Sequence, residues 1–276
     1  MRQGSVSPSW AWSIAVASGL VGCGAGESSP VDALEQAGQP LGAALYPDIQ
    51  EEIPAHLQIV NQQSHELLRF STTHMNLGAG TLQIRGGGQI APCDIDGVHY
   101  DSCTYATQEI LDATGQVVAT HPAGVAFYHP QHNHWHQSAV ARFELRSGTL
   151  AGPQVVTGTK ITFCLIDFDK TDWIHANSVR MYNRCDADVQ GISVGWGDSY
   201  HMSTEGQDFD VTGIPAGTYY LTHLADPENH WLETVEDNNF AWVKFVLTRK
   251  GANPEITVVD HSPCEVGTTC GTPSNK

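Results

Sequence analysis

The segment Phe240 to Leu247, FAWVKFVL, places apolar side chains at every second position, as a β-strand with a buried face does. Short segments of the same kind recur at residues 67–70, 81–84, 139–145, 160–165 and 218–223. Gly, Pro, Asn and Asp separate them, which is typical of turns. We find no internal repeat and no long helical pattern. The sequence therefore predicts an all-β fold, a β-sandwich with long loops and little helix.

Seven cysteines suggest how the loops are held. Cys93 with Cys103, and Cys264 with Cys270, flank short loops, which leaves Cys164 with Cys185. Cys23 belongs to the N-terminal export segment described below, and without it six cysteines remain. Six cysteines can form three disulfides, which predicts that the protein folds in an oxidising compartment. The alternative, thiolate metal ligands, lacks a C-x-x-C pair. Residues 168–210 carry few strand signals and are expected to form a long, stapled loop region.

The chain is strongly acidic. Its 276 residues include 30 acidic and 13 basic side chains, for a formal net charge of -17. Such a surface repels nucleic acid and anionic membranes and attracts cationic partners. Solubility alone is the plainer explanation of the same charge.

The N-terminal segment has the pattern of an export signal. Arg2 precedes an apolar stretch, residues 10–22, that is too short to span a bilayer. Its end, LVGC at 20–23, resembles the lipobox of bacterial lipoproteins, which implies cleavage before Cys23 and lipid attachment to that thiol. We predict a signal peptide over 1–22, a flexible tether over 23–50 and a domain over 51–276. The protein is then exported and lipid-anchored at the cell envelope, or otherwise simply secreted.

Histidines cluster at one place in the chain. His132, His134 and His136 alternate in the run HNHWH, and His129 lies just ahead of them. Neutral imidazole is the commonest transition-metal ligand. On a strand the three rings share one face, but a common ion requires a bend or bulge, so we expect a strand end or curved loop. The alternatives are a run of surface histidines and a zinc site without chemistry.

Three separated stretches resemble the lysyl oxidase family. The first is HNHWH at 132–136 with FEL at 143–145, which is similar to the family's copper-binding segment. The second is GTKITFCLID at 158–167, similar to the stretch whose lysine enters the family's cofactor. The third is QGISVGWGDSY at 190–200, which contains the position of the cofactor's tyrosine. Residues 210–219 and 233–239 resemble the family's closing strands.

The chain also departs from the animal members of that family. They have a cysteine inside the histidine cluster, where this chain has Pro130 and Gln131, and another at the position of Trp196. Trp135 replaces a tyrosine between the last two histidines. These differences suggest a bacterial branch and concern substrate choice and disulfide layout more than the metal site.

The resemblance implies an amine oxidase. Its cofactors are Cu(II), held by the three histidines, and lysine tyrosylquinone, formed from Lys160 and Tyr200. Asp198, two residues before Tyr200, is a candidate general base. The reaction converts a primary amine, O2 and water to an aldehyde, hydrogen peroxide and ammonia. The amine would be a small one or the lysine of a lysine-rich protein. The plainer interpretations are an ordinary strand lysine, a packed tyrosine and a turn aspartate.

Two other functions fit the same residues. One is a copper-binding surface protein of this fold without turnover. The other is a β-sandwich adhesion module with a different metal. Residues 236–239, EDNN, offer oxygen ligands for calcium, although a turn between strands explains them more simply.

Overall fold

The computed structural model describes residues 42–156, 160–172, 179–186, 188–204, 206–250 and 253–264, with only the backbone of Lys160 and Asn253. The chain divides into two units, 1–40 and 41–276, and everything below concerns the second. Its described residues are strands, turns and loops without helix, which confirms the all-β prediction. Accordingly, no helix able to cross a membrane is found among them.

The smaller of two antiparallel sheets is built around one long strand. Its strands are β1 (Ile49–Glu51), β2 (Ala55–Gln62), β3 (His65–Asn76), β10 (Asp169–Lys170), β12 (Trp196–Tyr200) and β13 (Asp208–Asp210). The first half of β3 pairs with β2 and β13, and its second half pairs with β1 and β12. Within these pairs His74 lies opposite both Glu51 and Asp198.

The larger sheet runs in the order β11-β4-β5-β6-β7-β14-β15-β16. Its strands are β4 (Leu82–Ile95), β5 (Val98–Leu111), β6 (Val117–His129), β7 (His134–Ser147), β11 (Val189–Ile192), β14 (Gly217–Ala225), β15 (Phe240–Lys250) and β16 (Asn253–His261), and β8 (Gln154–Val156) and β9 (Lys160–Phe163) pair with β7. All of these pairs are antiparallel.

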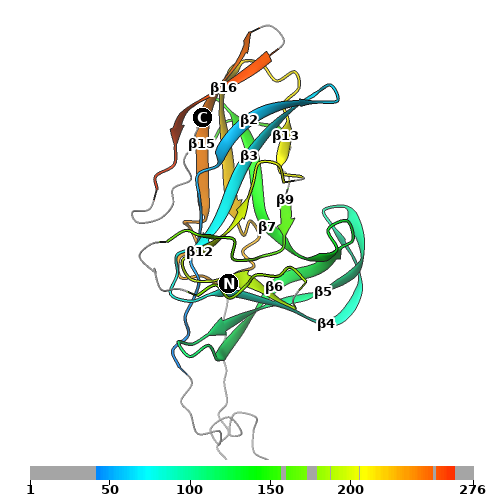
Figure 1. Ribbon diagram of the computed structural model, residues 1–276, viewed down its shortest axis with the longest axis vertical. Coiled ribbons are helices and arrows are strands. Elements are labelled where there is room, and N and C mark those ends of the chain that lie inside the picture. Colours follow the sequence, from blue (N-terminus) through cyan, green and yellow to red (C-terminus); the bar gives the residue numbers. More distant parts are fainter. Residues whose placement is uncertain are drawn as a thin grey trace, which may run out of the picture. The chain divides into compact units, whose positions relative to one another are not determined.

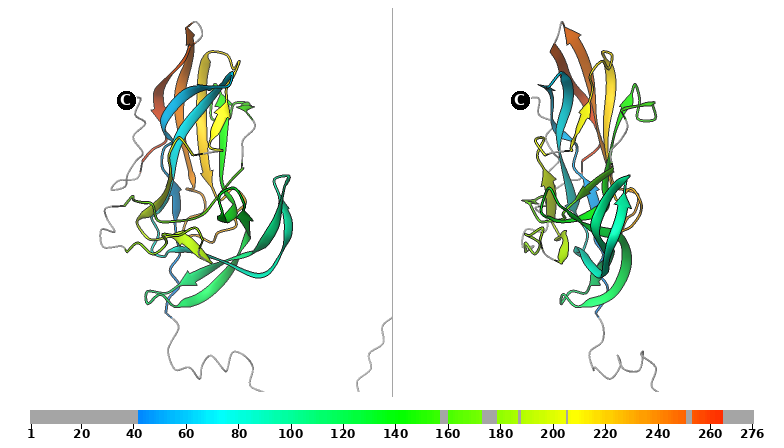
Figure 2. Two further views of the ribbon diagram at one scale, coloured as in Figure 1. Left: turned by 45° about the vertical axis from the view of Figure 1, so that its right-hand side comes forward. Right: turned by 90° about the vertical axis from the view of Figure 1, so that its right-hand side faces the viewer.

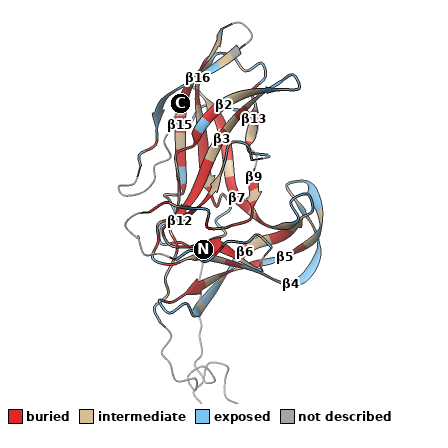
Figure 3. Cartoon of the chain, viewed as in Figure 1, coloured by how far each residue is buried: buried red, intermediate tan, exposed pale blue. Residues whose placement is uncertain are grey.

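The two sheets pack face to face in one part of this unit. Figure 1 shows β2 and β3 lying across β7 and β15, while β4, β5 and β6 curve away from them. Phe70 of β3 meets Phe143 of β7 edge to face, with ring centroids 5.1 Å apart. Leu221 and Val243 are fully buried behind them, and buried residues line the facing strands in Figure 3. Figure 2 shows the same two layers from the side.

The strand predictions agree with this architecture, with two differences. Each segment chosen for its period of two lies in or overlaps a strand. The region 168–210, expected to be loop, contains the short strands β10 to β13, which pair with strands formed elsewhere in the chain. The second difference is at the tether: Leu45 bridges to Leu111, and Ile49, which is fully buried, begins β1. Residues 42–50 therefore belong to the folded unit, because their apolar side chains pack on it, while the prediction for 1–41 lies outside the described residues.

Two of the predicted disulfides are present. Cys93 and Cys103 join β4 to β5, with Cα atoms 5.9 Å apart. Cys164 and Cys185 join the end of β9 to the loop before β11, with Cα atoms 5.4 Å apart. The predicted pair Cys264–Cys270 includes a residue outside the described part of the chain. The two bridges support a protein made in an oxidising compartment.

Candidate active site

A β-hairpin brings the histidines together. Strand β6 ends at His129, which pairs with His134 at the start of β7, so the turn between them carries His132. Asn133 closes this turn with a φ of 58°, a left-handed conformation that asparagine tolerates well. Further along β7, a register shift between Gln137 and Ala141 marks a bulge. The HNHWH run thus lies at a bent strand end, as its spacing predicts.

The three imidazoles of His132, His134 and His136 converge. His136 Nε2 lies 3.1 Å from His132 Nδ1 and also 3.1 Å from His134 Nε2. His136 Nε2 has either one proton or one lone pair to offer to its two neighbours, so a metal ion, which accepts a lone pair from each ring, would satisfy all three nitrogens better than hydrogen bonds between them. Two bonds of about 2 Å from a metal to nitrogen, at an angle of roughly 100°, produce this separation. The three side chains therefore have the geometry of a facial metal-binding set.

The surroundings orient the His136 ring and favour its neutral form. Thr162 Oγ1 lies 3.2 Å from Nδ1 of His136, a second contact of the kind that orients metal-binding histidines. Burial, and then the charges of His129, His134 and His132, lower the pKa of His136 to about 3. The ring of His129 stacks on those of His132 and His136, at centroid distances of 4.1 and 4.7 Å. The nitrogen lone pairs are therefore available near neutral pH.

Three neighbouring residues hold the ring and the hydroxyl of Tyr200. Its ring stacks on Phe163 at 3.7 Å, and its hydroxyl lies 2.8 Å from the carbonyl oxygen of Cys164 and 2.6 Å from Asp198 Oδ2. A hydroxyl has one proton to donate to these two acceptors. Burial raises the pKa of Asp198 to about 7, although Tyr200 and His74 oppose it. A protonated Asp198 would donate to the Tyr200 oxygen and leave the hydroxyl proton for Cys164.

Lys160 begins β9, the strand that also carries Phe163. Its backbone pairs with Arg142 of β7, and its side chain lies outside the described atoms. Phe163, on which Tyr200 stacks, follows Lys160 by three residues on β9. Three residues of strand span roughly 10 Å, so the backbones of Lys160 and Phe163 are separated by about that distance. The fold thus places the lysine segment beside the tyrosine segment, although β9 and β12 belong to different sheets.

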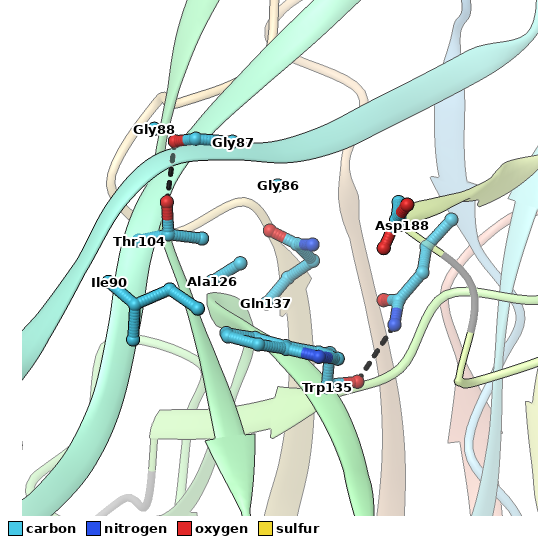
Figure 4. Close-up of a pocket in the computed structure, with 10 residues that line it drawn as sticks. Gly86, Gly87, Gly88, Ile90, Thr104, Ala126, Trp135, Gln137 and Asp188 are labelled. Atoms are coloured by element: carbon cyan, nitrogen blue, oxygen red, sulfur yellow. Dashed lines mark hydrogen bonds between the residues drawn. The ribbon is translucent and has the colours of Figure 1, made fainter.

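One cavity of about 540 Å³ joins these groups. Its lining includes His132, His134 and His136 on one side and Asp198 and Tyr200 on the other. A second cavity, of about 270 Å³, lies on the opposite face of the hairpin, where Trp135 and Gln137 alternate with the histidines. Figure 4 shows Trp135 there below Ala126 and Ile90, with its backbone oxygen accepting a hydrogen bond. A further cavity, of about 630 Å³, also reaches Tyr200 and is lined by His56, His201, Glu52 and Asp169. Among the described cavities, the one of about 540 Å³ is the one that contains His132, His134 and His136 together with Tyr200.

Asp167, the last residue of the GTKITFCLID stretch, anchors the loops around this cavity. Its fully buried carboxylate accepts hydrogen bonds from the backbone N–H groups of Met181, Tyr182 and Ser193 at 2.7 to 2.9 Å. The hydroxyl of Ser193 donates to it at 2.7 Å. Two loops that are distant in sequence are therefore held by one side chain.

Asp167→Ala is expected to lower the free energy of unfolding by about 3 kcal/mol, because the buried N–H groups of Tyr182 and Ser193 and the Ser193 hydroxyl lose their acceptor. Denaturant unfolding of the variant measures this loss. Asp169→Ala, two residues away on an exposed position of β10, is the matched control and should change stability by less than about 0.5 kcal/mol. A small effect at Asp167 would show that it does not organise these loops.

Residues 236–239 lie in the connection before β15, with a bend at 236–237, in line with the turn interpretation. Asn238 donates to Asp48 Oδ1 at 2.8 Å, and Asn239 donates to Glu233 Oε1 at 2.6 Å. Burial raises the pKa of Glu233 to about 8. The Asn238–Asp48 hydrogen bond joins the turn to the residue just before β1.

The comparisons with known proteins agree with this geometry. Residues 120–255 match the family model described as Lysyl oxidase. A stretch of 113 residues is 30% identical to Lysyl oxidase homolog 2 of Gallus gallus and to Lysyl oxidase homolog 4 of Mus musculus, and 31% identical to Lysyl oxidase homolog 2A of Danio rerio. It covers 41% of this chain and 14% of each relative, so the chain spans only a small part of those proteins. The resemblance to lysyl oxidases is confirmed, and all the predicted site residues lie within 120–255.

Proposed function

We propose that this protein is a copper- and quinone-dependent amine oxidase of the lysyl oxidase type. One observation carries the proposal: a single cavity has the three convergent imidazoles on one side and the Tyr200–Asp198 pair on the other. Similarity to lysyl oxidases over the same residues supports it. The reaction would convert a primary amine, O2 and water to an aldehyde, hydrogen peroxide and ammonia.

The residues present suit both groups. His132, His134 and His136 would hold Cu(II) through nitrogen ligands, with positions left open toward the cavity. Tyr200, held by Phe163 and Cys164, would join Lys160 in lysine tyrosylquinone. When formed, this quinone would supply the electron sink that amine oxidation needs, and the protein would contribute placement, burial and a base.

Asp198 is placed to accept a proton beside the Tyr200 oxygen. Its carboxylate is 1% exposed, so water competes little for it. The acidic surface of the chain, with its net charge of -17, would attract amines, which are cations at neutral pH. A small amine or the lysine of a lysine-rich protein would fit this requirement equally.

The direct test is turnover by the copper-loaded protein. Purified full-length protein, incubated with simple amines and with a lysine-rich protein, should release hydrogen peroxide in proportion to aldehyde. Copper loading without peroxide would instead indicate a copper-binding protein of this fold. Zinc or calcium in place of copper would favour the adhesion module.

Asp198→Asn tests the proposed base. The pKa of Asp198 lies near 7, with His74 and Asp167 as the other charged groups that influence it. The carboxyl is protonated and inactive below that pH, so the wild-type kcat should fall about tenfold per pH unit on the acid side. The variant should be at least about 100-fold slower and lose this acid limb. Asp169→Asn, on the neighbouring strand β10, is the control, and an unchanged pH profile in Asp198→Asn would exclude the role.

We also propose export with a lipid on Cys23, a residue outside the described part of the chain. The two disulfides support the export. Mass measurement of the mature N-terminus would show a lipid-modified Cys23, whereas an unmodified N-terminus further along the chain would indicate ordinary secretion.

A further inference from the structure

A second cluster of potential ligands lies in the core, apart from the histidine hairpin. Glu51 of β1, His74 of β3 and His223 of β14 all have side chains that are 0% exposed. Strands β1 and β3 belong to the smaller sheet and β14 to the larger one. The cluster therefore bridges the two layers of the sandwich. Glu51 and His74 also lie outside residues 120–255, so the match to lysyl oxidases does not include them.

The Glu51 carboxylate lies between the two imidazoles. Its Oε1 is 2.7 Å from His74 Nδ1, and its Oε2 is 3.1 Å from His223 Nδ1. The two ring centroids are 5.0 Å apart. One donor atom from each of the three residues lies within 4.8 Å of the other two. A metal ion bound to one nitrogen and one oxygen, by bonds of about 2 Å at roughly a right angle, would give nitrogen–oxygen separations of this size.

Protein groups alone leave this cluster incompletely satisfied. Glu51 Oε2 and His74 Nε2 meet no hydrogen-bond partner of good geometry among the described residues, and the His223 ring has only a loose contact with the backbone of Glu52. Phe143 lies 4.7 Å from His223, and Phe163 lies 6.0 Å from His74, centroid to centroid. The Tyr200 ring lies 6.1 Å from that of His74, and Asp198 lies opposite His74 in the sheet. Buried polar groups are normally paired, so each orphan atom here needs an explanation.

We propose that Glu51, His74 and His223 bind a divalent transition-metal ion that joins the two sheets. Two imidazoles and one carboxylate form a donor set that suits Zn²⁺ and related ions. The ion would use the carboxylate of Glu51 together with one nitrogen from each ring. Because its ligands come from both layers, it would stabilise their packing rather than take part in turnover.

Zinc stoichiometry tests this site separately from the hairpin. The full-length protein is produced in zinc-supplemented medium, since the buried cluster must fill during folding, and its zinc content is measured after desalting. Wild type should hold two ions per chain, and the triple variant His132→Ala/His134→Ala/His136→Ala should hold one. Adding His223→Val to the triple variant should remove the last ion, whereas adding His65→Val, at an exposed position of β3, should not.

Absorption spectroscopy with Co²⁺ and a melting-temperature measurement test the site in case the His223→Val variant folds poorly. The triple variant grown with Co²⁺ should show visible absorption from nitrogen and oxygen ligands, and Glu51→Gln in that background should weaken or shift it. The melting temperature of the triple variant should be higher when it is produced with zinc than after production in chelated medium.

A folded triple variant without bound zinc or cobalt would overturn the proposal, and the cluster would then be a buried proton-sharing group. This outcome does not depend on amine oxidation. A protein without oxidase activity can still carry the ion, and an active one can lack it.

Discussion

Tyr200→Phe is expected to abolish amine oxidation, with peroxide release falling to background. The hydroxyl is the atom from which the proposed cofactor would be built, and phenylalanine keeps the ring stacked on Phe163. The substitution also removes the hydroxyl partner of Cys164 and Asp198, so the free energy of unfolding should fall by about 1 to 3 kcal/mol. Peroxide assays and denaturant unfolding on the same preparation measure both effects.

Tyr182→Phe provides the matched control. Tyr182 is also a buried tyrosine, and its hydroxyl donates to Gln83 Oε1 at 2.7 Å. It does not line the cavity that contains Tyr200, so this variant should lose comparable stability and keep its activity. Peroxide release by Tyr200→Phe at the wild-type rate would contradict the assignment of the cofactor residue.

His136→Ala is expected to lose copper and activity together. His136 is 3% exposed, and its Nε2 lies 3.1 Å from nitrogens of both other histidines, so it is central to the set. Removal of a direct ligand should weaken copper binding by at least about 100-fold, because even outer contacts change affinity by 10- to 100-fold. Copper content after dialysis and competition with a chelator measure this.

His99→Ala, which removes an exposed histidine of β5 paired with Asp94, is the control and should leave copper binding unchanged. Chelation of the wild type should reproduce the loss of activity seen in His136→Ala, and added copper should restore it. Tight copper binding by His136→Ala would mean that the ion is held elsewhere.

Local sequence patterns predict the parts of this fold that depend on neighbouring residues. The alternation in residues 139–145 and 240–247 predicts β7 and β15, because a strand with a buried face shows its period in the sequence. The HNHWH run predicts convergent imidazoles at a bent strand end, and the hairpin between β6 and β7 provides that bend.

Other parts depend on contacts that no local pattern contains. Strand β12, WGDSY, lacks apolar alternation and contains residues that disfavour strands, so its pairing with β3 and β10 makes it a strand. Glu51, His74 and His223 meet from three strands far apart in the sequence, and nothing near any of them signals the other two. Asp167 belongs to a motif, but its role in holding two loops follows from the fold alone.

Peptide mapping of the copper-loaded, oxygen-exposed mature protein tests the central claim most directly. The account predicts that the peptides containing Lys160 and Tyr200 are recovered as one cross-linked species, and that its amount rises with copper content. Recovery of both peptides separately and unmodified, from protein with copper bound at the histidine hairpin, would contradict it.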